Sequence, residues 1–169
     1  PYDTFDYIEE IASRGFSVRL FWLLGDYGQY DKNLSYLNPA HRALIQRMTK
    51  TCVVGIHPSY ASNEKEYLLK EEQKRLSDII GKEVKTSRQH FLKLKFPDTF
   101  LNNLRVGITD DYTLGFAAKI GFRSGTLRAH QWFNLTKNEC TSLRLHPFAY
   151  MDGTLKKKKK LSIASAKVE

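Results

Sequence analysis

Apolar residues follow two different spacings along the first two thirds of the chain. Four segments have apolar side chains three or four positions apart, the spacing of a helix with one buried face: 3–15, 38–49, 66–81 and 97–107. Between them lie runs of strand-forming residues: FSVRLFWLLG at 16–25, CVVGI at 52–56 and EVKTS at 83–87. ITDDYTLG, at 108–115, begins a further strand or loop. The pattern predicts the order α-β-α-β-α-β-α-β.

The predicted helix boundaries carry recognisable capping residues. Asn38 and Pro39 are a favourable N-cap and first-turn pair, and Asn63 and Glu66 have the spacing of a capping box. Glycine follows the last apolar position of three helices, at Gly15, Gly81 and Gly107. Each helix and strand together take roughly 30 residues, as in a βαβ unit. We therefore predict an α/β protein with a parallel sheet.

The last third of the chain has a less regular pattern. We expect short extended segments at 121–126, 130–135 and 142–148, and a helix from about residue 154. No low-complexity linker divides the chain, so residues 1–169 are expected to form a single domain.

Polar residues gather where the predicted strands end. The carboxyl ends of parallel strands lie along one edge of a sheet, and α/β proteins bind their ligands there. Following the four strands in turn, the candidates at this edge are Asp26, Asp31, Lys32 and Asn33; His57, Ser59 and Tyr60; Arg88, Gln89 and His90; and Asp110, Asp111 and Tyr112, with Arg123, His146 and Asp152 near the end of the chain. The helix-to-strand turns offer little chemistry, so we predict the functional site at this edge.

His57 and His90 follow neighbouring strands and could bind one metal ion together. Two neutral imidazoles and a carboxylate would make a three-ligand catalytic zinc site with a position open for water. A single histidine at a strand end is more often a structural residue held by hydrogen bonds, so that reading stays open for each. For the acidic pair, we expect Asp110 or Asp111 to hold Arg88 by a bidentate bond.

Composition and charge add a weaker alternative. The chain has 169 residues and a net charge of +9, but removing the five consecutive lysines Lys156–Lys160 leaves +4. This run could be a nucleic-acid patch, although no aromatic residues interleave with it, and a solvated helix face is the simpler reading. Cys52 and Cys140 do not form a disulfide framework. With no charged-then-apolar leader, the sequence favours a cytoplasmic (bacterial) location.

Six segments together resemble the polysaccharide deacetylase family, and most closely a bacterial branch of it: PYDTFDYI, FWLLGDYGQYDKN, GIHPSYAS, SRQHFLKLKFPDTF, GITDDYTLGFAAKIGFRSGT and HPFAYMDGTL. The resemblance covers nearly the whole chain. It implies a distorted, incomplete (β/α) barrel with fewer than eight strands. It also implies an enzyme that removes acetyl groups from N-acetylated sugars with a divalent metal, commonly zinc.

The resemblance assigns the metal site only in part. The family's first motif is an aspartate pair on the first strand, one acid serving as general base and the other as metal ligand. The chain begins after that place, so we expect a fragment lacking the first strand. His57 matches the first of two family histidines four residues apart, but Ala61 stands at the second position. We hypothesise that His90 replaces the missing ligand.

Further roles follow from the same resemblance. Arg88 matches the family's arginine, and Asp110 or Asp111 would orient it. His146 is the nearest match to the general acid, with Asp152 as its competitor and an ordinary strand residue as the alternative. The expected substrate contacts are Tyr60, through its backbone or hydroxyl group to the acetyl oxygen, and Arg123.

Three functions are therefore in competition. The first is hydrolytic deacetylation of a carbohydrate, with no nucleic-acid or membrane partner. The second is an inactive deacetylase-like barrel that binds carbohydrate or a partner, which the absence of a second histidine at Ala61 favours. The third is a basic nucleic-acid-binding module that depends on Lys156–Lys160. The sequence leaves the sugar and the oligomeric state open.

Overall fold

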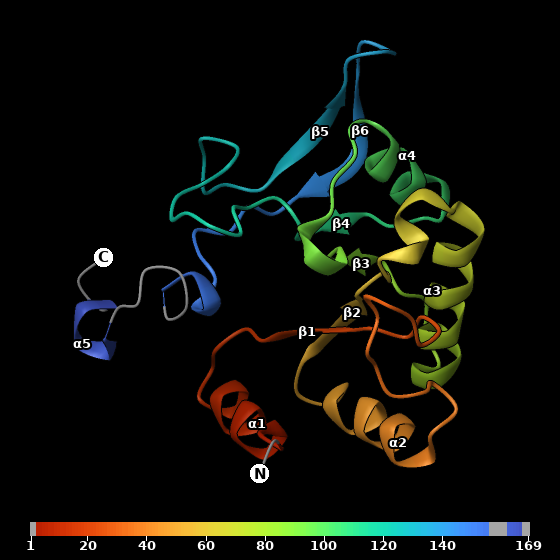
Figure 1. Cartoon of the computed structure of the whole chain (residues 1–169), viewed down its shortest axis with the longest axis vertical. Coiled ribbons are helices and arrows are strands. Elements are labelled where there is room, and N and C mark those ends of the chain that lie inside the picture. The colour runs from red at the N-terminus through yellow and green to blue at the C-terminus, as the bar shows by residue number, and fades with distance from the viewer. Residues whose placement is uncertain (1–2, 156–161, 167–169) are drawn as a thin grey trace.

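The computed structural model describes residues 3–155 and 162–166. Its helices are α1 (Phe5–Ser13), α2 (Pro39–Met48), α3 (Glu66–Ile80), α4 (Asp98–Arg105) and α5 (Ile163–Ala166), with short 3-10 helices η1 (Ala61–Glu64) and η2 (His90–Leu92). Its strands are β1 (Arg19–Trp22), β2 (Val53–Ile56), β3 (Thr86–Ser87), β4 (Asp110–Asp111), β5 (His130–Asn134) and β6 (Glu139–Leu145). The predicted alternation of helices and strands from α1 to β4 is confirmed (Figure 1).

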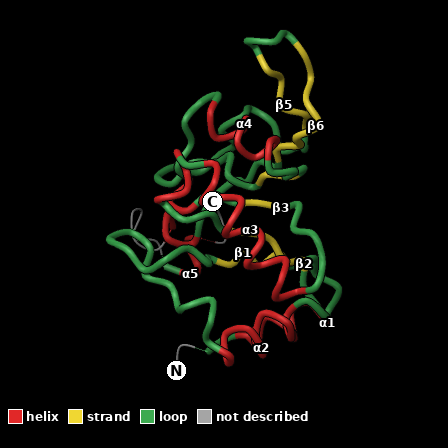
Figure 2. The backbone as a smooth tube through the Cα atoms, turned by 90° about the vertical axis from the view of Figure 1, so that its right-hand side faces the viewer, coloured by secondary structure: helices red, strands yellow, loops and turns green. Residues whose placement is uncertain are grey.

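The six strands form one sheet in the order β1-β2-β3-β4-β6-β5. Every neighbouring pair is parallel except β5 and β6, which form an antiparallel hairpin that projects from the top of the view in Figure 2. The predicted parallel sheet is thus confirmed, and the segments expected at 130–135 and 142–148 overlap β5 and β6. The strand expected at 121–126 is wrong, because Gly121 and Gly125 have positive φ angles of 114° and 71° and the backbone turns there.

The predicted capping residues have different outcomes. The Asn38 side chain accepts hydrogen bonds from the first turn of α2, and Pro39 is its first residue, as expected. The capping box of Asn63 and Glu66 is wrong, since Lys65 occupies the N-cap of α3 and makes no side-chain cap bond. The Asn63 amide donates instead to the Lys93 carbonyl, 2.9 Å away, and so ties η1 to the loop after η2.

One face of the sheet, the outer face, is apolar and covered by helices. Figure 1 shows α2, α3 and α4 following one another along this side of the strands. Buried side chains of the strands and helices make one core: Trp22, Val54, Ile56, Leu143 and Leu145 from the sheet, and Ile45, Met48, Leu76, Ile79 and Phe100 from the helices. Full burial of one such side chain contributes about 1.5–3 kcal/mol, so the helix-facing side chains are the main source of stability.

The opposite, inner face of the sheet is curved and carries polar residues. Side chains alternate between the two faces of a strand, and the rings of Phe21 and Tyr112, from β1 and the end of β4, lie 5.5 Å apart on the inner face. Two strands, β2 and β3, lie between β1 and β4 in the sheet. The two rings can therefore meet only if the sheet bends toward its inner face. Gly55 permits the bend, because a Cβ there would lie 2.8 Å from the Phe21 ring.

None of the helices in the described ranges is long and apolar enough to cross a membrane. Cys52 is buried and Cys140 is exposed, and both thiols are free.

Candidate functional site

Four residues that follow the parallel strands stand in one row along the inner face. The His57 N–H donates to the carbonyl of Trp22, at the end of β1, and the Arg88 N–H donates to Ile56, at the end of β2. In the same way, the N–H groups of Tyr112 and His146 donate to the last residues of β3 and β4. These four backbone bonds continue the parallel ladder, and they hold the residues side by side in the order His57, Arg88, Tyr112, His146.

His57 is a neutral, oriented imidazole. Its Nδ1 contacts the carbonyl oxygen of Arg88, which can only accept a hydrogen bond, so Nδ1 carries the proton. Burial is the largest influence and lowers the pKa of His57 to about 4, although the bond to the Arg88 carbonyl works against this shift. At neutral pH, Nε2 of His57 therefore presents an unprotonated lone pair.

His90 lies beside His57, as the sequence analysis expected. The two ring centroids are 4.9 Å apart. Nδ1 of His90 lies 2.9 Å from a carboxylate oxygen of Asp31, which is 3% exposed and also accepts the Tyr60 N–H at 2.8 Å. A carboxylate at Nδ1 selects the tautomer whose Nε2 is free to bind a metal.

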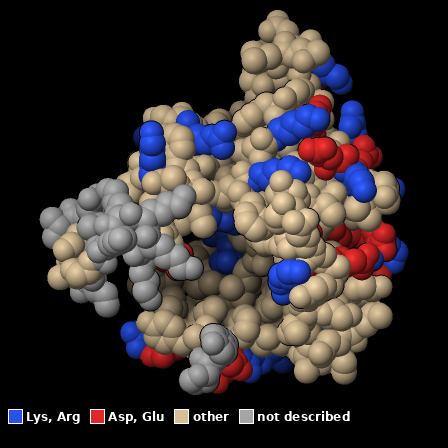
Figure 3. Space-filling model, in the orientation of Figure 1, with Lys and Arg blue, Asp and Glu red and all other residues tan. Residues whose placement is uncertain are grey.

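The two histidines line a cavity of about 390 Å³, within the range of small-molecule sites. Its walls come from the ends of β2 and β3, from η2 and from two later loops: His57, Arg88, Gln89, His90, Phe91, Leu92, Ala117 and Met151. Figure 3 shows a hollow near the middle of this face, with Lys or Arg atoms (blue) on its wall. The edge predicted to hold the site therefore does carry a cavity.

The described residues supply only part of a metal site. Within residues 3–155 and 162–166, no group of three or more His, Cys, Asp or Glu side chains is arranged to hold a metal ion. His57 and His90 provide two imidazoles, while Asp31 stands behind His90 as its hydrogen-bond acceptor. A three-ligand zinc site would need one more donor.

The expected bidentate bond between Arg88 and an aspartate is wrong. Nη1 of Arg88 donates to the Tyr112 carbonyl at 3.3 Å, and its guanidinium lies 4.2 Å from the centre of the Phe148 ring. Asp111 instead accepts bonds from Ser87 at 2.7 Å and Asn103 at 3.0 Å on the outer face. Burial lowers the pKa of Arg88 and the charge of Asp111 raises it, so the two interact through space without a bond.

Asp110 binds the proposed general acid rather than the arginine. One carboxylate oxygen lies 2.6 Å from Nε2 of His146 and 2.8 Å from Nε of Arg144. Burial works to raise the pKa of Asp110, but hydrogen bonds from Arg144, His146 and Thr109 together lower it to about 2. His146 stacks on Tyr112 with 4.2 Å between ring centroids. It belongs to the row of strand ends but does not line the cavity.

The remaining predicted site residues are less central. The Tyr60 N–H is already bonded to Asp31, so the backbone contact expected from Tyr60 to an acetyl oxygen is wrong; its hydroxyl role stays a prediction. Arg123 is exposed, 5.9 Å from the centre of the Phe96 ring, and Asp152 is exposed at the start of a helical turn. Neither lines the cavity. The run Lys156–Lys160 lies outside the described residues.

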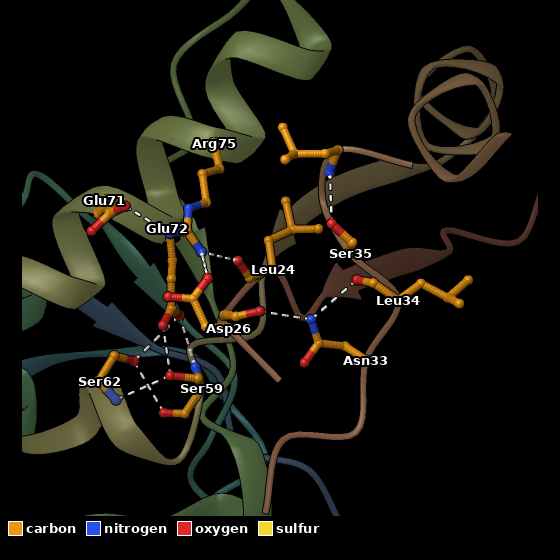
Figure 4. Close-up of polar contacts among 12 residues, drawn as sticks. Leu24, Asp26, Asn33, Leu34, Ser35, Ser59, Ser62, Glu71, Glu72 and Arg75 are labelled. Atoms are coloured by element: carbon orange, nitrogen blue, oxygen red, sulfur yellow. Dashed lines mark hydrogen bonds and ion pairs between the residues drawn. The ribbon is translucent and has the colours of Figure 1, made fainter. Parts of the chain in front are cut away.

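Glu72 is a supporting residue that the sequence analysis missed. It is 3% exposed and accepts hydrogen bonds from the Ser59 N–H at 2.8 Å, the Ser59 hydroxyl at 2.6 Å and the Ser62 hydroxyl at 3.3 Å (Figure 4). Burial raises its pKa, while these donors lower it. A signal was present, because Glu72 falls between Leu69 and Leu76 on the buried face of α3.

Arg75 fixes the loop after β1, which places Asp31 next to His90. Its Nη1 donates to the Leu24 carbonyl at 2.9 Å and to Asp26 at 3.0 Å, directly after β1 (Figure 4). Further along the same loop, the Asn33 amide donates to the Gly25 carbonyl at 2.7 Å. The loop is therefore folded back on its own beginning, with Asp31 facing η2.

Taken together, the fold and the site define an α/β protein with a cavity at the carboxyl edge of its parallel sheet and two oriented imidazoles in the cavity wall. A scan against protein-family models gives no match, and a search of the curated proteins likewise finds none.

Proposed function

We propose that the protein is a metal-dependent deacetylase of N-acetylated sugars, built on the distorted (β/α) barrel that the sequence resemblance implies. The proposal is carried by one observation: His57 and His90 lie side by side at a cavity, each with Nδ1 engaged by a fixed acceptor. Both Nε2 atoms are thereby left as lone-pair donors, the state in which imidazole binds a divalent metal.

His57 and His90 would hold the ion, zinc in most of the family. When bound, such an ion acidifies a water molecule and polarises a carbonyl group. The resemblance assigns the third ligand and the general base to the aspartate pair of the family's first motif. In the described part of the chain β1 pairs only with β2, and its other edge is where the strand of that motif would add.

The row of strand ends supports a division of roles around the acetamide. In hydrolysis, water adds to the acetyl carbonyl, the C–N bond breaks, and the amine leaves with a proton while acetate is released. The cationic Arg88 lies in the cavity wall, where it favours an oxygen that gains negative charge. His146, held by Asp110, is the proposed proton donor to the amine. Asp152 is the alternative acid.

Metal content and acetate release test the proposal in the full-length protein. We expect bound zinc and acetate release from a chitin oligosaccharide, and we expect His57→Ala and His90→Ala each to lower metal affinity at least tenfold. His130→Ala, which alters a histidine on the β5 hairpin, is the matched control. Unchanged metal content in His90→Ala would contradict the assignment of His90 as a metal ligand. Strong deacetylation by residues 1–169 alone would refute the need for the aspartate pair of the first motif.

One observation favours a second candidate, a deacetylase-like barrel that binds carbohydrate without cleaving it. The described residues contain two candidate ligands rather than three. This candidate predicts that the full-length protein binds the oligosaccharide equally well with and without a chelator and releases no acetate.

A further inference from the structure

An aromatic cluster borders the cavity on the side of η2. The rings of Tyr30 and Tyr60 lie 4.4 Å apart between centroids, and the Phe91 ring meets both edge-on, at 6.1 Å and 5.8 Å. Phe91 also contacts His90, with 4.5 Å between their centroids, and lines the cavity. The cluster is therefore continuous with the two histidines.

The three rings have different accessibility. Tyr30 is 47% exposed and Phe91 is 60% exposed, whereas Tyr60 is partly buried and has the Lys93 ammonium 4.0 Å from its ring centre. Tyr60 therefore supports the cluster from behind, and Tyr30 and Phe91 present their rings to solvent. Two large exposed aromatic side chains in contact with each other form an apolar surface patch, and such patches are typical of binding sites.

The backbone holds Phe91 in this position at a conformational cost. Phe91 and the next residue, Leu92, have positive φ angles of 57° and 52°, in the left-handed region that bulky residues rarely adopt. The turn is secured by the Leu92 N–H to the Gln89 carbonyl and by Asn63 to the Lys93 carbonyl. Strained backbone of this kind persists where the surroundings impose it, and it concentrates at functional sites.

We propose that Tyr30 and Phe91, supported by Tyr60, form a stacking surface for a pyranose ring of an N-acetylated oligosaccharide. The inference rests on the proposed function and names the subsite next to the reacting sugar. A pyranose whose ring hydrogens are axial has an apolar C–H face that packs on aromatic rings, while its equatorial hydroxyls stay in water. The order along the molecule, from the aromatic cluster through Phe91 to His90 and His57, places one sugar on the rings when its neighbour reaches the cavity.

Binding of the N-acetylglucosamine hexamer to the full-length protein tests the inference without requiring turnover. In a ligand-observed NMR experiment, stacking would shift the sugar H1, H3 and H5 signals upfield by ring currents. Titration calorimetry would give affinities for Tyr30→Ala and Phe91→Ala, each expected to be about tenfold weaker, as for truncation of a central aromatic contact. Tyr30→Leu, which keeps apolar volume but removes one of the two exposed rings, should reduce the upfield shifts.

Phe16→Ala is the matched control, because Phe16 is 65% exposed but precedes β1 and lies toward the opposite edge of the sheet. Unchanged affinity in both Tyr30→Ala and Phe91→Ala, or no binding of the hexamer, would overturn the stacking surface. Hexamer binding with upfield shifts but no acetate release would support the surface and contradict the deacetylase. Acetate release that is lost in His57→Ala but unchanged in both aromatic variants would support the deacetylase and contradict the stacking surface.

Discussion

Asp110 and Asp111 are neighbours in β4, yet they serve opposite faces of the sheet. Asp111 is fully buried on the outer face and accepts bonds from Ser87, Asn103 and the Thr113 N–H. Asp110 lies on the inner face, where it binds the exposed Arg144 and the partly exposed His146. The outer face uses its polar groups to join α4 to the sheet, and the inner face leaves charged groups within reach of solvent and ligand.

The largest effect is expected from Asp111→Ala. Removal of this carboxylate takes away the acceptor that three buried donors share, which should lower the free energy of unfolding by about 3 kcal/mol. Asp110→Ala is the matched control on the inner face, where the carboxylate is partly exposed and its partners can turn to water, so its cost should be smaller, at about 1–2 kcal/mol. Urea unfolding measures both variants. Equal losses would erase the distinction between the two faces.

The curvature of the inner face predicts a smaller cost for Gly55→Ala. The new methyl group would press on the Phe21 ring and on the Thr86 hydroxyl, and overpacking of this kind costs about 1–3 kcal/mol. Gly28→Ala is the control, since a Cβ there approaches only the Asp26 carbonyl, at 3.9 Å. If thermal unfolding showed no difference between the two alanine variants, the close approach of β1, β2 and β3 on this face would be contradicted.

Asp31→Asn separates orientation of the site from stability of the fold. The amide can no longer act as a charged acceptor for both His90 and the Tyr60 N–H. Loss of such an acceptor behind a metal-binding histidine lowers metal affinity about 10- to 100-fold. Zinc titration by competition with a chelating dye measures the effect, and Asp78→Asn, which alters an exposed carboxylate paired with Lys74 on α3, is its control. Equal zinc affinities would remove Asp31 from the site.

A pH dependence of the free energy of unfolding should come from His57. Its pKa is about 4 in the folded chain, against about 6.5 for an ordinary histidine, so between these values the unfolded chain binds a proton that the folded chain does not. The free energy of unfolding should therefore fall as the pH drops from about 6.5 to 4. NMR titration of the metal-free protein would give the midpoint directly, and a value near 6.5 would contradict a buried imidazole.

The elements could be predicted from the sequence because their signals are local. Apolar spacing and the Asn38–Pro39 cap depend on residues within one or two turns, and both agree with the structure. Asn63 was misread because its partner, the Lys93 carbonyl, is 30 residues away in the chain. A capping pattern cannot report such a contact.

The site was predicted less completely because it depends on register and loop paths. Adjacent aspartates in a strand point to opposite faces, but only the pairing of Asp110 with Arg144 decides which one meets His146. The strand-end rule brought His57 and His90 together. The role of Asp31 could not be seen, because it lies in a loop whose course is set by Arg75 and Asn33 rather than by a repeating pattern.

In the proposed site, His57 and His90 both offer Nε2 to one divalent ion. Nitrogen-15 NMR of the imidazole rings tests this arrangement directly, because the two ring nitrogens of each histidine have distinct shifts. In the metal-free protein, the neutral form of both histidines should carry its proton on Nδ1, and stoichiometric zinc should shift Nε2 of both residues together. A proton on Nε2 of either ring, or a zinc response confined to other histidines, would contradict the account.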